Sequence, residues 1–105
     1  MVYELRIYHM NPGKMEDTRK RFKDDVFPLW PKYGIKATEF WEDAEGKETM
    51  YYVCEFESAE AKDKLWKTFL SSDEWLKIKA RTEADGPLVE RVESYLMKNA
   101  DFFSK

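Results

Sequence analysis

The chain has 105 residues, a net charge of −3, and a composition that is 43% hydrophobic and 16% aromatic. This length suits one domain that buries about two-thirds of its unfolded surface, and the apolar content excludes an intrinsically disordered protein. The negative net charge argues against nucleic acid as a partner, because phosphate binding needs a basic face.

A strand followed by a helix is predicted for the first third of the chain. Residues 2–10 alternate between two kinds of side chain, with the period of two that is typical of a half-buried strand. Apolar residues over 15–33 then recur at helical spacing. Pro28 and Pro31 should distort the end of that helix, because each lacks an amide donor. Gly34 is well placed to end it in the left-handed conformation.

The remainder of the chain predicts a hairpin, a second helical segment and a last strand. Residues 35–43 and 48–56 read as two strands joined by a turn. Ser58 is a predicted N-cap for the following helix. The segment from Ser71 to Glu74 has the form of a capping box, which predicts that the helix restarts there. Residues 88–98 alternate again as a strand.

The predicted order β-α-β-β-α-β is that of a ferredoxin-like α+β fold, formed by a single domain over residues 1–105. Right-handed crossovers would place both helical segments on one face of a four-stranded antiparallel sheet. The side chains predicted to face the helices are Leu5, Ile7, Met50, Tyr52, Cys54, Phe56, Val92 and Leu96. The opposite face is predicted to carry Glu4, Arg6, Tyr8, Tyr51, Val53, Glu55, Arg91, Glu93, Tyr95 and Met97.

This second face mixes large aromatic side chains with ions, which is typical of an interface or a binding groove. A second copy of the same sheet, related by a two-fold axis, would cover it. The sequence therefore predicts a homodimer that forms a dimeric α+β barrel with a partly polar interior.

Several short segments, in the right order, resemble the NIPSNAP family from Val2 to about Phe103. They are Glu4-Leu5-Arg6-Ile7-Tyr8, Pro12-Gly13-Lys14, Phe40-Trp41, Ser72-Asp73-Glu74-Trp75, and Val92-Glu93-Ser94-Tyr95-Leu96-Met97-Lys98. The resemblance implies a ferredoxin-like fold and a dimeric α+β barrel, and it implies no established reaction. The chain departs from the family pattern at Tyr52, Cys54 and Asn99, where relatives commonly have His, Trp and Pro.

His9 is the one histidine of the chain and the candidate catalytic residue. Histidine is the usual general base, because its unperturbed pKa lies near neutrality. At the mouth of the barrel, His9 could take a proton from a small organic substrate. The alternative is a partly exposed residue at the end of the first strand.

The candidate ligand-binding residues are the ions and aromatic side chains of the open sheet face: Arg6, Tyr8, Trp41, Glu55, Arg91 and Tyr95. A guanidinium could hold a ligand carboxylate or enolate through its planar fork of donors. Alternatively, the charges neutralise one another across strands, with Arg6 close to Glu55. The aromatic side chains could line a pocket or pack at the dimer interface.

No cofactor or metal site is predicted. Cys54 is the one cysteine and should be a buried, inert thiol, and the carboxylates lack the spacing of a calcium loop. No apolar run approaches the ~20 residues that a membrane-spanning helix needs, and no targeting segment precedes the first strand. We therefore expect a cytoplasmic protein.

Two functions remain open. The first is a non-catalytic homodimer that binds a small organic ligand or acts as a scaffold for a partner. The second is a cofactor-independent enzyme, of the oxygenase or isomerase type, that acts on a small aromatic or keto substrate inside the barrel. The second rests on fold analogy alone.

Overall fold

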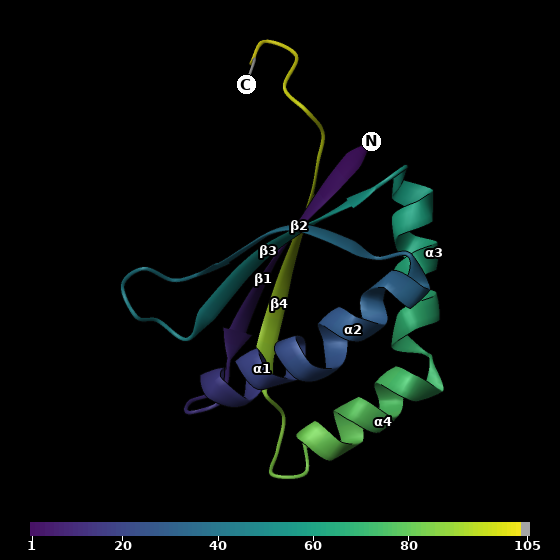
Figure 1. Cartoon of the computed structure of the whole chain (residues 1–105). Coiled ribbons are helices and arrows are strands. Elements are labelled where there is room, and N and C mark those ends of the chain that lie inside the picture. Colours follow the sequence, from purple (N-terminus) through teal and green to yellow (C-terminus); the bar gives the residue numbers. More distant parts are fainter. Residues whose placement is uncertain (104–105) are drawn as a thin grey trace.

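The computed structural model describes residues 1–103, which form four strands and two helical segments (Figure 1). The elements are β1 Val2–Met10, α1 Met15–Arg21, η1 Phe22–Val26, α2 Phe27–Leu29, η2 Trp30–Tyr33, β2 Lys36–Glu42, β3 Thr49–Phe56, α3 Ala59–Leu70, α4 Asp73–Thr82 and β4 Val89–Met97. The strands form one antiparallel sheet in the order β2-β3-β1-β4. The helices cover one face of this sheet. The predicted ferredoxin-like α+β fold is thus confirmed.

The first helical segment is irregular where the sequence predicted it. It passes from α1 into a π-helical turn, η1, then through the short α2 into the 3₁₀ turn η2. Pro28 and Pro31 lie in α2 and η2, where their missing amide donors interrupt the regular hydrogen-bond ladder. Gly34 ends the segment with φ of 73°, a left-handed conformation that glycine adopts without strain.

The second helical segment has one predicted cap in place and one displaced by a residue. Ser58 caps α3, and its hydroxyl accepts a hydrogen bond from the amide of Ala61 at 3.0 Å. The cap of α4 is Ser72, which accepts from the amide of Trp75 at 3.2 Å. The predicted capping box beginning at Ser71 is therefore wrong. The Ser71 hydroxyl instead donates to the Lys67 carbonyl in the last turn of α3.

The core lies between the helices and the sheet and is largely aromatic. Phe22 packs edge-on against Phe40 at 5.0 Å and against Tyr52 at 5.7 Å between ring centroids. Phe40 stacks on Tyr52 at 4.9 Å. Trp30, in η2, joins this cluster and also reaches Trp66 of α3. These contacts hold the first helical segment over β2 and β3.

The strand register shows that the predicted orientation of β1 is wrong. Arg6 lies directly opposite Tyr52 on β3 and Ser94 on β4, and residues opposite each other in an antiparallel pair share a face. Because Tyr52 is fully buried under the helices, Arg6 faces the helices too. The same alternation places Glu4 and Tyr8 on the helix side.

Leu5 and Ile7, predicted as core residues, consequently lie on the face that the helices leave open. The predicted orientations of β3 and β4 agree with the register. The open face carries Tyr3, Leu5, Ile7 and His9 from β1, Trp41 from β2, Tyr51, Val53 and Glu55 from β3, and Arg91, Glu93, Tyr95 and Met97 from β4. It is therefore more apolar than the sequence predicted.

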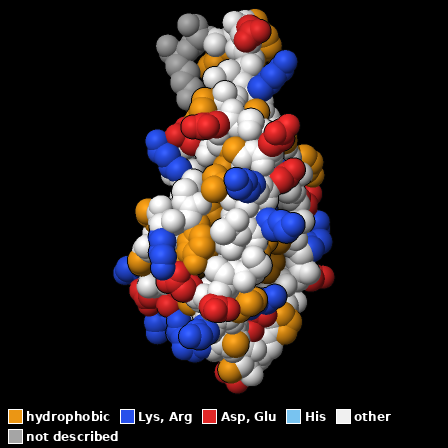
Figure 2. All heavy atoms as spheres, turned by 90° about the vertical axis from the view of Figure 1, so that its right-hand side faces the viewer, with side chains coloured by type: hydrophobic (Ala, Val, Ile, Leu, Met, Phe, Trp, Pro, Cys, Tyr) orange, Lys and Arg blue, Asp and Glu red, His pale blue; other side chains and the backbone are white. Residues whose placement is uncertain are grey.

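The opposite side of the molecule is mixed in character. Figure 2 shows the side that carries α3, where hydrophobic side chains form separate patches among charged side chains of both signs. Across residues 1–103, no helix has the length and apolar character needed to cross a membrane.

Candidate functional site

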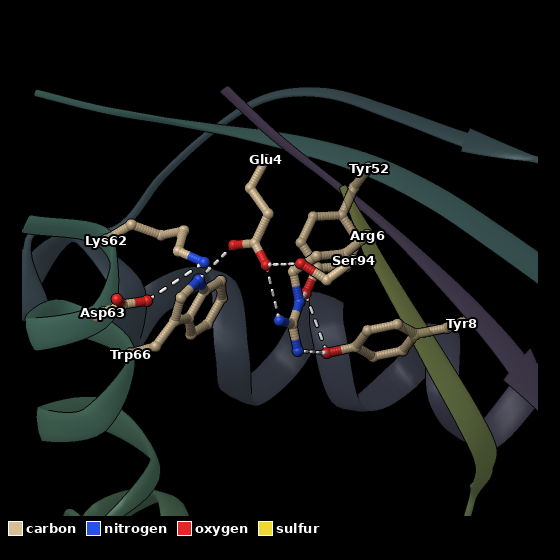
Figure 3. A network of polar contacts seen from close by, with 8 residues as sticks. All are labelled: Glu4, Arg6, Tyr8, Tyr52, Lys62, Asp63, Trp66 and Ser94. Carbon is tan, nitrogen blue, oxygen red and sulfur yellow. Dashed lines mark hydrogen bonds and ion pairs between the residues drawn. The ribbon is translucent and has the colours of Figure 1, made fainter. Parts of the chain in front are cut away.

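A buried carboxylate, that of Glu4 on β1, organises the polar contacts between the sheet and α3 (Figure 3). Its Oε1 accepts a hydrogen bond from the Trp66 indole at 2.5 Å. Its Oε2 accepts from Ser94 Oγ at 2.5 Å and from Arg6 Nη1 at 3.1 Å. Three donors and one positive charge thus compensate a side chain that is only 1% exposed, as burial of a charge requires.

Arg6 connects this carboxylate to two phenols. Its Nε donates to the Tyr52 hydroxyl at 2.8 Å, and its Nη2 lies 3.4 Å from the Tyr8 hydroxyl. The guanidinium also lies over the Trp66 ring, 4.5 Å from its centroid, a favourable cation–π position. Burial acts against the Arg6 cation, but Tyr52, Tyr8 and Glu4 outweigh it and raise the pKa of Arg6 above its ordinary value. Arg6 therefore stays charged beneath the helices.

The direction of the bond between the two phenols leaves one hydroxyl hydrogen unused. The Tyr52 hydroxyl is fully buried and lies 2.9 Å from that of Tyr8. Its hydrogen points to Tyr8, because a buried donor without an acceptor is costly. Burial, first of all, and the neighbouring Tyr8 raise the pKa of Tyr52 well above its usual value, so Tyr52 keeps this hydrogen.

The Tyr8 oxygen therefore receives hydrogen bonds from Arg6 and Tyr52. A phenol has one hydrogen of its own to donate, and no acceptor for it is present among the described residues. Hydrogen bonds in a chain polarise one another, which makes this hydroxyl a strong donor.

Tyr8 borders a pocket of about 320 Å³ between the helices and the β4 side of the sheet. Most of the wall is formed by aromatic and aliphatic side chains of the two helical segments, β1 and β4. They include Phe22, Val26, Trp30, Trp66, Phe69, Leu70, Trp75, Val89 and Val92. The volume and the apolar lining are those of a small-molecule site.

Trp30 also lines this pocket, but its indole nitrogen is covered. The residue is 3% exposed, and its indole nitrogen is buried without a hydrogen-bond partner within residues 1–103. Buried polar atoms are seldom left unpaired. Because the nitrogen itself has almost no accessible surface, Trp30 contributes its ring to the pocket wall and the Tyr8 hydroxyl is the candidate donor.

Two of the ions at the edge of the pocket, Arg21 and Glu83, pair with each other. Arg21 of α1 donates to Glu83 at 2.9 Å and lies over the Trp75 ring at 5.0 Å. Lys79 and Arg91 also border the opening. Since Arg6 faces Glu4 and Arg21 faces Glu83, the buried positive charges of the site are already balanced.

The structure divides the predicted site residues between two places. Arg6 and Tyr8 lie under the helices, where Glu4, and not the predicted Glu55, neutralises Arg6. Glu55 instead pairs with Lys36 at 2.8 Å. The prediction that all six ligand-binding residues share the open face is therefore wrong. Side chains alternate between the two faces of a strand, and Arg6 and Tyr8 belong to the set of β1 side chains that faces the helices.

The other predicted residues lie on the open face. His9 Nε2 is 2.5 Å from Glu93 Oε2, and the Tyr95 hydroxyl donates to the other oxygen of Glu93 at 2.9 Å. The hydrogen bond with His9 and, to a smaller extent, that from Tyr95 lower the pKa of Glu93 below its usual value. Trp41 and Tyr95 are 49% and 50% exposed. His9 is thus held by a carboxylate, on the sheet face opposite Arg6.

Tyr52, Trp66, Trp30 and Ser94 were not among the predicted site residues. Tyr52 was predicted to face the helices, where it does lie. Trp30 and Trp66 are core residues of the helical segments, and nothing in their spacing distinguishes a core side chain from a pocket wall. One signal was available for the β1 register. Val2, Tyr8 and Met10 share the alternation of Glu4 and Arg6, so apolar residues flank the ions on that face.

The site offers no metal-binding cluster. Within the described part of the chain, no three His, Cys, Asp or Glu side chains come together in a way that could hold a metal ion. Burial, together with the nearby Glu4 carboxylate, raises the pKa of Cys54 to about 12, which makes this thiol a poor ligand and nucleophile. The arrangement can bind an apolar molecule and donate a hydrogen bond, or a proton, to it.

Comparisons with known proteins agree with this architecture. The model of the NIPSNAP family matches residues 3–104. The chain is similar to an uncharacterized NIPSNAP domain protein from Burkholderia xenovorans over 100% of both chains, with a TM-score of 0.82 and 17% identity. A NIPSNAP family protein of unknown function from Agrobacterium tumefaciens has a TM-score of 0.82 and 19% identity, over 98% of this chain and 91% of that chain.

A more distant similarity joins the chain to an antibiotic biosynthesis monooxygenase. The TM-score is 0.65 at 10% identity, over 95% of this chain and 99% of that chain. At this identity the similarity concerns the fold alone. The comparison with curated proteins gives no match.

Proposed function

This chain belongs to the NIPSNAP family, and from that premise we propose that it is a homodimer that binds a small apolar molecule between its sheet and its helices. The observation that carries the proposal is the Tyr8 hydroxyl. The Tyr8 side chain borders an aromatic pocket of about 320 Å³, and its hydroxyl receives hydrogen bonds from Arg6 and Tyr52. We infer that the hydroxyl keeps its own hydrogen for a ligand.

The network beneath the pocket supports a binding role over a purely structural one. Glu4, Tyr52 and the Trp66 ring hold Arg6 in place. The contact of Arg6 with the Tyr8 hydroxyl, together with that of Tyr52, orients the Tyr8 side chain, which borders the pocket. Preorganised donors of this kind are typical of sites that orient a ligand.

Binding can be measured with prodan, a neutral ketone whose fluorescence rises and shifts to the blue in an apolar environment. Three tryptophans, Trp30, Trp66 and Trp75, line the pocket, so we expect energy transfer from them to bound prodan. The variant Val92→Trp should block the opening, because Val92 borders it and is 43% exposed. Leu76→Trp is the control, since Leu76 on α4 is 48% exposed, similar to Val92, and does not border the pocket. Equal binding by both variants would contradict the proposed site.

The open face of the sheet supports the homodimer. Trp41, Tyr95 and Met97 are 49%, 50% and 38% exposed there, and Leu5 and Ile7 lie between them on the central strand. A two-fold axis would pack this face against the same face of a second chain, so that each chain covers the open face of the other. Aromatic and methionine side chains are typical of the cores of such interfaces.

Sedimentation equilibrium tests this part of the proposal. We expect a reversible dimer at micromolar protein concentration. A monomer across the micromolar range would contradict it, and would leave the pocket proposal standing, because the pocket is formed within one chain.

A cofactor-independent enzyme is the second candidate, and the contact of Tyr8 with Arg6 favours it. A phenol bonded to a guanidinium can protonate a carbonyl oxygen, while the positive charge stabilises an enolate. His9 cannot serve as the base in this pocket, because it lies on the other face of the sheet. The carboxylate of Glu90, which borders the pocket, would take the methyl proton as Tyr8 protonates the carbonyl oxygen. Exchange of the methyl protons of acetophenone in D₂O tests this reading. Exchange that depends on Tyr8 would support the enzyme, and its absence despite binding would support the binding protein.

A further inference from the structure

The free polar group of the pocket wall is a donor. The Tyr8 hydroxyl has a hydrogen without an acceptor in the described chain, and the Tyr8 side chain lines the pocket. The carboxylates at the edge are differently placed, since Glu83 is bonded to Arg21 and Glu90 is exposed.

The charges of the pocket favour a neutral ligand. Arg6 is paired with Glu4 at 3.1 Å, and Arg21 with Glu83 at 2.9 Å. Bringing a carboxylate into this apolar space would cost its desolvation. Lys79 and Arg91 border the opening but are exposed, so among the described residues no unbalanced buried cation compensates that cost. A carbonyl oxygen needs only a hydrogen-bond donor, which the Tyr8 hydroxyl would supply.

We propose that the pocket selects a neutral apolar ketone, whose carbonyl oxygen accepts from the Tyr8 hydroxyl and whose ring lies among the tryptophans. This inference rests on the proposed function, because it names the ligand class of the same pocket. An apolar molecule of the same shape without the oxygen would leave the Tyr8 hydroxyl hydrogen unpaired. That loss is expected to weaken binding, since an unsatisfied buried donor costs more than a hydrogen bond gains.

Matched small molecules separate the effect of the carbonyl oxygen on binding from the effect of a negative charge. Acetophenone and ethylbenzene have nearly the same shape and differ in the carbonyl oxygen, while benzoate replaces the ketone with a carboxylate. The indole N–H signals of ¹⁵N-labelled protein report binding, because three of the four tryptophans line the pocket. Trp41 lies on the open face and serves as the internal control.

We expect acetophenone to bind at least about fivefold more tightly than ethylbenzene, the ratio that one net hydrogen bond produces, and more tightly than benzoate. Tyr8→Phe should remove most of this preference, in part by raising the affinity for ethylbenzene, because the variant has no hydroxyl for this ligand to leave unpaired. Binding of ethylbenzene by the variant also shows that the pocket is intact. Tyr33→Phe is the matched control, because its hydroxyl bonds to Glu74 and does not border the pocket.

The possible failures are distinguishable. Equal binding of ethylbenzene and acetophenone, or tighter binding of benzoate, would overturn the neutral-ketone inference and leave the proposed binding function standing. A preference for acetophenone that persists in Tyr8→Phe would also overturn it, since Tyr8 would not be the donor. If no probe moves the pocket indoles, the proposed function itself fails.

Discussion

Replacing Arg6 tests the buried network that supports the pocket. Arg6→Met keeps much of the aliphatic packing but leaves the Glu4 carboxylate, 1% exposed, without its cation. Removing one partner of a buried ion pair costs about 3–5 kcal/mol. We expect a loss of stability near the lower end, because Trp66 and Ser94 still donate to Glu4.

The second arm of the cycle is Glu4→Gln, which keeps the shape of the side chain and removes its charge. The Arg6 guanidinium, whose side chain is 15% exposed, then lacks its counter-ion, and we again expect a loss of about 3 kcal/mol. In the double variant no unpaired buried charge remains. Its loss should therefore be close to that of one single variant, which gives a coupling energy of about 3 kcal/mol.

Urea unfolding of the four proteins at one fixed concentration measures this coupling. The slope of the transition should stay constant, so that shifts of the midpoint report stability. Equal protein concentrations matter because dimerisation adds to apparent stability. Losses that add within about 0.5 kcal/mol would show that the two residues act independently and would refute the buried ion pair. Arg6→Met with Glu55→Gln is the control, and it should be additive, since Glu55 pairs with Lys36.

Three further predictions concern other parts of the molecule. Tyr95→Ala should weaken the dimer by about 2 kcal/mol or more in sedimentation equilibrium, whereas Leu76→Ala, exposed on α4, should not; an unchanged dimer would exclude Tyr95 from the interface. Because burial raises the pKa of Cys54 to about 12, folded protein at mildly alkaline pH should react with an aromatic disulfide reagent far more slowly than protein in urea, and equal rates would contradict its burial. Ser72→Ala should cost about 1 kcal/mol of stability as the loss of an N-cap, and Ser71→Ala less than about 0.5 kcal/mol; the reverse order in thermal unfolding would restore the predicted capping box.

The order of the elements was predictable because strong local signals mark their ends. Proline and glycine act on the local backbone, so the effects of Pro28, Pro31 and Gly34 do not depend on tertiary contacts and can be predicted from the sequence. Alternation also identified β1 correctly as a strand. It did not decide which face of β1 is buried, because both faces of this strand carry apolar side chains and the ions Glu4 and Arg6 counted against the face that is in fact buried.

The β1 register depended on contacts that one strand cannot reveal. Glu4 and Arg6 are ionic, and ions are normally placed outside a core. Their burial is possible because Trp66 and Tyr52, far along the chain, supply a donor and a phenol at the right positions. The pocket was unpredictable for the same reason, since its wall joins residues from both helical segments and two strands. The sequence identified Arg6 and Tyr8 as candidates, but it did not predict which residues they contact.

A crystal structure of the protein soaked with acetophenone tests the central claim most directly, which is that the Tyr8 hydroxyl presents a free donor to an apolar pocket. We expect the ketone between the helices and the β4 side of the sheet, with its oxygen within hydrogen-bond distance of the Tyr8 hydroxyl and its ring against Trp30 or Trp66. An acceptor from the protein itself on the Tyr8 hydroxyl, or acetophenone bound only on the open sheet face, would contradict the account.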